Sequence, residues 1–286
     1  MKEIVVISGK GGTGKTSVTA AFAALARNTV FADCDVDAAD LHLILQPEIQ
    51  QRNQFRGRDK ARIIPEKCSD CGICLEHCRF DAIESEPQYH IDPISCEGCG
   101  VCQYLCPEEA VEMTPSISGE WYLSKTRFGP MVHAKLGIAE ENSGKLVALV
   151  RMQAKLLAEN RSSDYILIDG APGVGCPVIS CITGADYALV VTEPTVSGVH
   201  DMKRICELTK YFKIPTTICI NKWDLHPETS QQIEKTADDM GVSVIGKIGY
   251  DRAFDKAQRQ GLSIVEYGDG GAKEVLERIW NKIQHL

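Results

Sequence analysis

Residues 8–16 read Ser8-Gly9-Lys10-Gly11-Gly12-Thr13-Gly14-Lys15-Thr16, and Gly9 to Thr16 fit the phosphate-loop pattern G-x-x-x-x-G-K-[ST]. A short apolar run precedes this loop at residues 3–8, and an Ala-rich run follows it at residues 17–26. In a strand–loop–helix arrangement of this kind, backbone N–H groups and a helix N-terminus close on an anion. The sequence therefore predicts a nucleotide site, with Lys15 on the β- and γ-phosphates and Thr16 on Mg²⁺.

Composition and charge limit the class of protein. The chain has 286 residues, 44% hydrophobic and 24% charged, as expected for a soluble globular protein. Its net charge of −8 argues against a nucleic-acid-binding surface, which is normally basic. No apolar run approaches the ~20 residues that span a bilayer, and the first strand follows Met1 directly. We therefore expect a cytoplasmic protein without a signal peptide, a membrane span or a nucleic-acid partner.

The second lysine of the loop, Lys10, makes the pattern more specific. The run KGGTGKT resembles the deviant Walker A loop of the MinD/ParA/nitrogenase-iron-protein family of ATPases. Three other stretches resemble the same family: residues 33–37 its first switch, residues 165–173 its Walker B strand and second switch, and residues 221–224 its N-K-x-D base contact. The resemblance covers residues 1–50 and about 140–286.

This resemblance implies roles for individual residues. Lys10 would reach across a dimer to the other subunit's nucleotide, and Asp35 would orient the attacking water. The implied catalytic residues are Lys10, Lys15 and Asp35, and the implied Mg²⁺ site is Thr16, Asp33 and Asp169. The implied nucleotide-binding residues are Gly9, Lys10, Gly11, Gly12, Thr13, Gly14, Lys15, Thr16, Ser17, Asn221 and Asp224. N-K-x-D also occurs in GTPases; the family favours ATP, while residue chemistry alone leaves ATP and GTP open.

A tandem cysteine array is the second strong signal. Of thirteen cysteines, eight lie between residues 68 and 106, in two C-x-x-C-x-x-C-x-x-x-C runs that repeat with a period of 28 residues. In a cytoplasmic protein these are not expected to be disulfides. Three thiolates on one tight loop suit three corners of a cuboidal cluster, and the fourth ligand must come from elsewhere. Zinc usually takes two C-x-x-C pairs at longer separation, so the pattern favours iron–sulfur clusters.

The array looks like a bacterial two-cluster ferredoxin domain over residues 61–115. The resemblance implies two [4Fe–4S] clusters, one held by Cys68, Cys71, Cys74 and Cys106 and the other by Cys78, Cys96, Cys99 and Cys102. Arg79 follows Cys78 where the ferredoxin pattern has Pro. This departure leaves ligation intact but changes the charge near the second cluster.

The rest of the chain predicts an α/β fold with a mostly parallel, doubly wound sheet. Residues 38–45 are expected to form a helix, and the polar, basic residues 50–62 a solvated linker. Strands at 120–124 and 129–136 would form a hairpin returning to the sheet, with His133 as an ordinary strand residue. A helix is expected from Asn142 to Ala158, and the last helix, 272–286, should dock on its own sheet because its basic excess is small.

We therefore predict a discontinuous P-loop ATPase domain, residues 1–60 and 116–286, with an inserted α+β two-cluster ferredoxin domain, residues 61–115. The closest named group is the MinD-superfamily P-loop ATPases that contain an inserted ferredoxin. The predicted function is Mg²⁺-dependent ATP hydrolysis coupled to electron transfer, with a homodimer or pseudo-homodimer on ATP binding and a redox protein as partner.

Two other functions stay open. One is an iron–sulfur cluster carrier or assembly ATPase like the Mrp relatives, although the last cysteine is Cys219 and their C-terminal C-x-x-C is absent. The other is a MinD-like positioning ATPase, which would not require the cysteine array.

Cys176 lies on the predicted second switch, seven residues beyond Asp169. The nitrogenase iron protein resembles this stretch and carries there a Cys that helps to bridge a cluster across its dimer. Such a bridge would need another Cys from each subunit, either Cys34 or Cys181. We favour the simpler interpretation, a small apolar residue that opens a helix.

Overall fold

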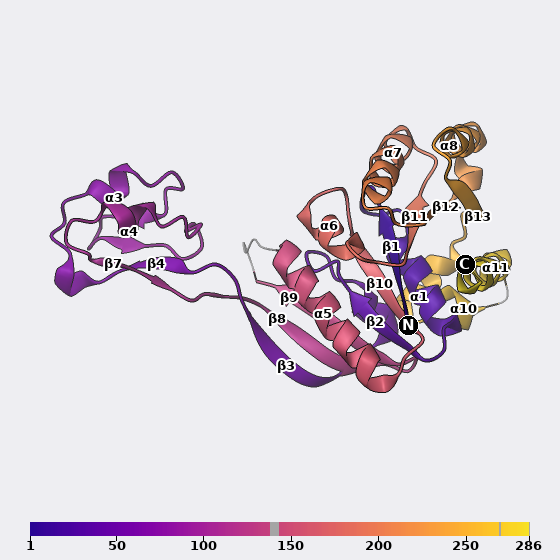
Figure 1. The fold of residues 1–286 in the computed structure, drawn as a ribbon, viewed down its shortest axis with the longest axis horizontal. Helices are drawn as coiled ribbons and strands as arrows, with labels where there is room; N and C mark the ends of the chain where they lie inside the picture. The colour runs from indigo at the N-terminus through magenta and orange to yellow at the C-terminus, as the bar shows by residue number, and fades with distance from the viewer. Residues whose placement is uncertain (138–142, 269, 286) are drawn as a thin grey trace. The chain divides into compact units, whose positions relative to one another are not determined.

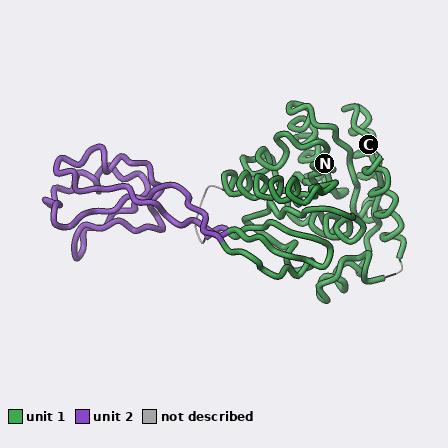
Figure 2. The backbone as a smooth tube through the Cα atoms, turned by 60° about the horizontal axis from the view of Figure 1, so that its bottom comes forward, with its two compact units in different colours: residues 1–52, 121–135, 143–286 green, residues 53–120, 136–142 purple. Residues whose placement is uncertain are grey.

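The computed structural model describes residues 1–137, 143–268 and 270–285. The chain divides into two compact units (Figure 2). Unit 1 comprises residues 1–52, 121–135 and 143–286, and unit 2 comprises residues 53–120 and 136–142.

A nine-stranded sheet has the order β13-β12-β11-β1-β10-β2-β9-β8-β3 (Figure 1). The strands that pair in parallel are β1 (Lys2–Ser8), β2 (Thr29–Asp33), β9 (Pro130–Leu136), β10 (Tyr165–Pro172), β11 (Tyr187–Thr192), β12 (Thr216–Asn221) and β13 (Ser243–Ile248). Because both faces of the central strands are covered, β1 and β11 are buried over almost their whole length and read as continuous apolar runs. The mostly parallel sheet confirms the predicted fold class of the P-loop part.

Helices cover both faces of this sheet. Residues of β1 that point to one face, such as Ile4 and Val6, share a core with α1 (Lys15–Leu25), α2 (Leu41–Leu45), α10 (Ile264–Tyr267) and α11 (Gly271–Gln284). The helices α5 (Ser143–Arg161), α6 (Cys176–Ile182), α7 (Val196–Tyr211) and α8 (Pro227–Asp239) pack against β2, β10, β11 and β13. The short helix α9 (Ala253–Arg259) precedes α10. Residues 223–225 form a single 3₁₀ turn after β12.

The last helix docks on its own unit, as the sequence predicted. Leu276, Ile279 and Trp280 of α11 are buried, and the ring centroids of Trp280 and Phe22 of α1 are 5.2 Å apart. Ile279 lies so close to Gly246 of β13 that a Cβ on that glycine would overlap it. Within the described ranges, no helix is long and apolar enough to cross a membrane.

The predicted hairpin is also present. β8 (Ile117–Lys125) and β9 are neighbours in the sheet, joined by a tight turn in which Thr126 N–H donates to the carbonyl of Gly129 at 2.8 Å. His133 is a buried strand residue whose Nε2 lies 2.8 Å from Ser124 Oγ. Burial lowers the pKa of His133 to about 4, so this imidazole is neutral at physiological pH.

The prediction of a solvated linker at residues 50–62 is wrong. This segment contains most of β3 (Glu48–Arg56), the edge strand of the large sheet, and all but the last residue of β4 (Lys60–Ile63). Most of β3 is exposed, so the strand lacks the apolar alternation by which strands are recognised. Pairing and side-chain stacking hold it instead, because the Arg52 guanidinium lies over the Tyr122 ring, 5.5 Å from its centroid.

Two helix boundaries also differ from the sequence expectation. The helix expected over residues 38–45 begins only at Leu41. α5 is described from Ser143 and extends to Arg161, three residues beyond the expected end. The expected start of this helix at Asn142 lies outside the described residues.

Unit 2 is small and has little regular structure. β4 pairs antiparallel with β7 (Val111–Thr114), and β5 (Ile83–Glu84) pairs antiparallel with β6 (His90–Ile91). A 3₁₀ turn at residues 65–67 precedes the first cysteine, and the helices α3 (Ile73–Glu76) and α4 (Val101–Leu105) follow the first two cysteines of each run. The buried apolar core is Ala61, Ile63, Ile83 and Val111, and six cysteines pack against it.

Candidate functional site

The loop between β1 and α1 owes its shape to two of its glycines. Gly12 and Gly14 have φ of 80° and 89°, a left-handed backbone that side chains disfavour. A Cβ on Gly14 would also overlap the amide of Asn221, whose Nδ2 donates to the carbonyl of Thr13 at 2.8 Å. The end of β12 therefore fixes the loop from outside.

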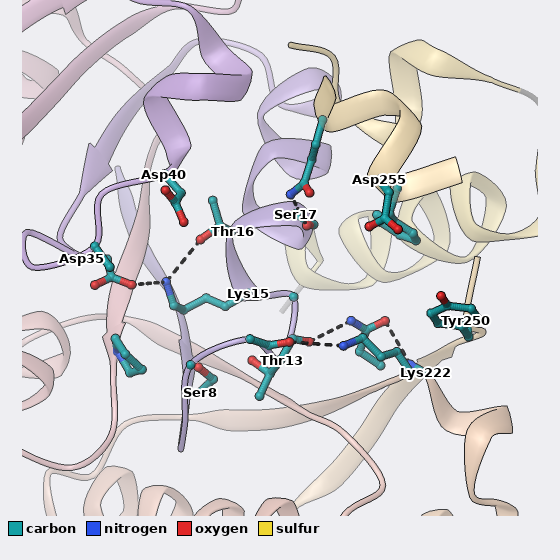
Figure 3. A pocket seen from close by; sticks show the side chains of 18 of the residues that line it. Ser8, Thr13, Lys15, Thr16, Ser17, Asp35, Asp40, Lys222, Tyr250 and Asp255 are labelled. Atoms are coloured by element: carbon teal, nitrogen blue, oxygen red, sulfur yellow. Dashed lines mark hydrogen bonds and ion pairs between the residues drawn. The ribbon is translucent and has the colours of Figure 1, made fainter. Parts of the chain in front are cut away.

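The loop lines a cavity of about 360 Å³ (Figure 3). This volume falls within the roughly 300–1,000 Å³ of small-molecule sites. The lining residues are Ser8, Gly11, Gly12, Thr13, Gly14, Lys15, Thr16, Ser17, Asp35, Ala38, Asp40, Pro172, Asn221, Lys222, Gly249, Tyr250, Asp251, Phe254, Asp255 and Gln258.

Lys15 is the buried cation among the residues that line this cavity. Its Nζ lies 3.1 Å from Asp169 Oδ1 and 3.2 Å from Asp35 Oδ2, and Figure 3 shows it directed between Asp35 and Thr16. Burial acts to lower the pKa of Lys15, but the charges of Asp169, Asp35 and Asp33 outweigh it and raise this pKa above its usual value. Lys15 therefore remains an ammonium ion despite being buried.

Asp169 holds the first turn of α1. It is fully buried in β10, where its Oδ2 accepts from Thr16 Oγ1 at 2.7 Å and its Oδ1 accepts from Thr19 Oγ1 at 3.0 Å. Because β1, β2 and β10 run parallel side by side, their carboxyl ends bring the loop, Asp33 and Asp169 to one edge. Hydroxyl and carboxylate oxygens together are the ligands that Mg²⁺ prefers.

Asp33 has one buried carboxylate oxygen without a hydrogen-bond partner among the described residues. Its Oδ1 accepts from the N–H of Asp35 at 3.2 Å, and the oxygen without a partner is Oδ2. Burial and the charge of Asp169 raise the pKa of Asp33 well above its usual value. Burial also raises the pKa of Asp35, against the opposing effect of Lys15. A free buried oxygen beside Asp169 suits a hydrated Mg²⁺ ion.

Lys10 points away from the cavity. Its Nζ lies 2.6 Å from Glu193 Oε1 and 3.2 Å from the hydroxyls of Thr195 and Ser197 at the start of α7. Glu193 also binds Lys222, whose Nζ is 3.2 Å from Glu193 Oε2. The sequence prediction missed Glu193, because the only signal for it is its position just after β11.

At the other end of the cavity, only part of the predicted base contact lines the wall. Asn221 and Lys222 do so, but Asp224 does not, because its Oδ1 accepts from the N–H of Tyr250 at 2.7 Å. Tyr250 and Phe254 supply aromatic surface there that the sequence prediction missed. Ser17, which was predicted, lines the cavity and accepts from Gln258 Nε2 at 3.0 Å.

Unit 2 contains two small cavities lined by cysteines. The residues lining one include Cys68, Cys71, Cys74 and Cys106, and those lining the other include Cys78, Cys96, Cys99 and Cys102. The thiol of Cys106 accepts from the N–H of Ala110 at 3.2 Å. Among the residues that the structure describes, no three His, Cys, Asp or Glu side chains converge to hold a single metal ion. A [4Fe–4S] cluster makes a different demand, since its four thiolates surround a cube.

The cysteines of unit 1 are arranged differently. Cys176 is exposed at the first residue of α6, whereas Cys34 and Cys181 are fully buried, and Cys181 Sγ accepts from the N–H of Ala171 at 3.5 Å. Because both are inside the unit, Cys34 and Cys181 do not suit the role of further ligands to a cluster shared between two subunits.

A family model described as the CobQ/CobB/MinD/ParA nucleotide binding domain matches residues 4–264. The chain belongs to this family. Nearly the whole chain falls within the match, including the loop of residues 8–16, Asp169 and Asn221. The CobQ/CobB/MinD/ParA domain thus accounts for the phosphate loop and the sheet edge on which the cavity is built.

Individual proteins are also similar to this chain. The uncharacterized protein MJ0578 of Methanocaldococcus jannaschii is 38% identical over 77% of this chain and 78% of its own. An iron–sulfur cluster carrier protein of Pyrococcus abyssi is 29% identical over 44% of this chain and 48% of its own. The septum site-determining protein MinD of Pyrococcus horikoshii, solved with Mg-ADP, has a TM-score of 0.58 at 18% identity, covering 99% of this chain and 95% of that one. This structural likeness confirms the α/β P-loop fold.

Proposed function

We propose that this chain binds and hydrolyses ATP with Mg²⁺ and couples its nucleotide state to electron transfer through two [4Fe–4S] clusters. The observation that carries the proposal is that one chain combines two kinds of site. One is a phosphate-loop cavity with a buried Lys15–Asp35–Asp169 cluster. The other is a pair of cavities, each lined by four cysteines.

In the nucleotide site, Lys15 and Asp35 would exchange partners. The ammonium that binds Asp35 here would turn to the β- and γ-phosphates, which carry more negative charge than one carboxylate. Asp35 would then be free to orient the attacking water. Thr16 and Asp169 would hold Mg²⁺, with Asp33 Oδ2 accepting from a water of the ion, and the metal would neutralise charge on the phosphates.

The end of the cavity at Asn221 and Lys222, where the nucleobase would bind, favours ATP over GTP. A GTPase-type aspartate reads guanine through two N–H groups, which requires its carboxylate to face the base. Asp224 instead accepts from the backbone of Tyr250 and lies outside the cavity lining. Asn221 and the aromatic side chains of Tyr250 and Phe254 remain to contact the base, and they make no demand specific to guanine.

In unit 2, each four-cysteine set would hold one cluster, and the clusters would supply one-electron transfer when bound. Cys71 and Cys99 are exposed, so each cluster would come close to the surface at one thiolate. Residues 53–120 carry thirteen Asp and Glu but six Lys and Arg, so this unit is acidic. We therefore propose a redox partner with a basic face.

The experiment uses protein reconstituted anaerobically with iron and sulfide. We expect about eight iron atoms per chain and electron paramagnetic resonance signals of reduced [4Fe–4S] clusters. Oxidation of the reduced clusters by cytochrome c, a basic redox probe, should differ in rate between the ATP and ADP states. Stoichiometric zinc without iron, or equal rates in both states, would contradict the proposal.

The hydrolytic role of Asp35 has its own test. Asp35→Asn should lower Mg²⁺-dependent ATP hydrolysis by about a hundredfold or more while ATP still binds, because the water loses its acceptor. Asp238→Asn, a matched change at an exposed carboxylate of α8, should leave hydrolysis unchanged. Equal hydrolysis by both variants would remove Asp35 from the proposed mechanism.

A second candidate function is an iron–sulfur cluster carrier, which the P. abyssi relative favours. The two functions differ in the fate of the clusters during turnover. Electron transfer requires retention of iron through repeated ATP hydrolysis in the presence of a chelator, whereas a carrier would lose its iron under these conditions.

A further inference from the structure

We propose that Glu193 is a positioning residue that holds Lys10 within its own chain, and that ATP-driven dimerisation must exchange this contact for one across the dimer. This inference rests on the proposed function, extended by the role that the family resemblance implies for Lys10, contact with the nucleotide of a second subunit across a dimer. It assigns a regulatory role to a residue that the sequence motifs do not include.

The contact is well formed at both partners. Lys10 Nζ is 2.6 Å from Glu193 Oε1, and the two side chains are 30% and 16% exposed. Thr195 and Ser197 hydroxyls complete the surroundings of the ammonium at 3.2 Å each. Burial acts to raise the pKa of Glu193, but hydrogen bonds from Lys10 and Lys222 outweigh it and keep this pKa below its usual value. Glu193 is therefore a carboxylate at neutral pH, and it competes with phosphate for the same ammonium.

The backbone on both sides of this pair is fixed. Gly9, directly before Lys10, packs so closely on Asp201 of α7 that a Cβ would overlap it. On the other side, Thr195 Oγ1 caps α7 by accepting from the N–H of Gly198 at 3.0 Å, and Gly198 itself lies against the carbonyl of Glu193. The loop and α7 thus hold Lys10 and Glu193 opposite each other before any nucleotide binds.

Lys222 makes release of Lys10 feasible. Its Nζ lies 3.2 Å from Glu193 Oε2 and 3.2 Å from the carbonyl of Gly12. When Lys10 leaves, Glu193 keeps a cation and is not left as an unpaired, partly buried charge. Lys222 follows Asn221, which lines the end of the cavity where the nucleobase would bind. Glu193 binds both lysines, so it also connects Lys10 to the segment that would contact the nucleobase.

The sign of the effect follows from this competition. Removing the charge of Glu193 should free Lys10 and strengthen ATP-dependent dimerisation, whereas loss of a merely structural ion pair would weaken or not affect it. We expect Glu193→Gln to lower the dimer dissociation constant by about fivefold, the lower end of coupling between linked sites. In the Lys10→Ala background the same change should have no effect on dimerisation, since the group that is released is absent.

The experiment has two readouts on the full chain. The first is the rate of reductive methylation of Lys10, read by mass spectrometry without nucleotide. It should be slow in the wild type and in the control Glu207→Gln, an exposed carboxylate on α7, and at least fivefold faster in Glu193→Gln. Equal methylation rates in all three proteins would overturn the inference whether or not the protein dimerises.

The second readout is sedimentation with Mg²⁺ and a non-hydrolysable ATP analogue. Tighter dimerisation of Glu193→Gln, abolished in the Lys10→Ala/Glu193→Gln double variant, supports the inference. Dimerisation of Glu193→Gln equal to or weaker than that of the wild type overturns it. A wild type that does not dimerise with the analogue contradicts instead the role across a dimer that the resemblance implies for Lys10, and the methylation rates then decide the Lys10–Glu193 contact separately.

Discussion

The two units of this chain differ in how the fold and the site support each other. In unit 1, the charged cluster around Lys15 rests on a sheet whose central strands are buried on both faces, together with large side chains such as Phe22 and Trp280. In unit 2, the buried apolar cluster of Ala61, Ile63, Ile83 and Val111 is small, and six cysteines pack against it together with Tyr89, Ile91 and Met113. The fold of unit 1 therefore supports its site, whereas under the proposed function we expect the fold of unit 2 to depend on the groups that its cysteines would bind.

Charge separates the units as well. Residues 53–120 carry thirteen acidic and six basic side chains, an excess of seven acids in a chain of net charge −8. Nearly all of the acidity thus lies in the cysteine-bearing unit. In unit 1, by contrast, carboxylates such as Asp35 and Glu193 are matched by nearby lysines. We therefore expect repulsion among the carboxylates to weaken the fold of unit 2.

The largest expected effect comes from removing iron. Stripping the reconstituted protein with a chelator should unfold unit 2, because its buried apolar cluster is small and much of the packing around that cluster comes from the cysteines that would bind the iron. Unit 1 should keep its thermal transition and its nucleotide affinity within about twofold, well under 1 kcal/mol. Limited proteolysis with and without iron measures this, and cleavage should appear only within residues 53–120. Equal protease resistance of iron-free and iron-loaded protein would mean that unit 2 folds without its clusters.

Lys15→Ala tests the other side of the comparison. It should weaken nucleotide binding by at least about a hundredfold, because Lys15 is the only buried cation among the residues that line the cavity. It should also lower the free energy of unfolding of unit 1 by about 3–5 kcal/mol, because Asp35 and Asp169 lose their buried partner. Calorimetry and iron analysis together measure this. Iron content should not change, and Lys203→Ala, an exposed lysine of α7, should change none of these quantities.

A smaller effect is expected from Asp33→Asn. The pKa of Asp33 is raised in the folded state, so the wild type loses stability as pH rises from about 4, the usual range of an aspartate, through that raised pKa. Asn has no charge to bury, and the variant should therefore be more stable by about 1 kcal/mol at pH 7 and equal to the wild type at pH 3. The Mg²⁺ concentration needed for hydrolysis should rise. Denaturant melts at both pH values measure the first effect, and a difference that grows towards low pH would refute it.

The sequence predicted what depends on local pattern and strand order. The Gly9–Thr16 motif predicted the phosphate loop, and the family resemblance implied that Asp33 and Asp169 join it; in the structure parallel strands bring all three to one sheet edge. The 28-residue cysteine repeat indicated two cysteine sites, and the resemblance to a two-cluster ferredoxin implied the four thiols that line each cavity.

Three features depended on tertiary contacts and were not predictable in this way. The edge strand β3 has no apolar face, so its pairing leaves no periodic signal. Glu193 gains its role from two lysines, one 183 residues before it in the chain and the other 29 residues after it. Asp224 fits a base-binding motif, yet its carboxylate is taken by the backbone of Tyr250. In each case the partner, and not the residue type, decides what the side chain does.

The smallest expected effect is that of Cys176→Ser, and it tests whether iron is confined to unit 2. Cys176 is exposed at the start of α6, but Cys34 and Cys181, the thiols that would have to join it in a bridge between subunits, are free thiols that are fully buried. A cluster needs four ligands, and two copies of Cys176 supply two. We therefore expect about sixteen iron atoms per ATP-bound dimer in both the wild type and Cys176→Ser, as eight insert cysteines per chain would bind. A loss of about four iron atoms in the variant would indicate a third cluster between the subunits, and iron would then not be confined to unit 2.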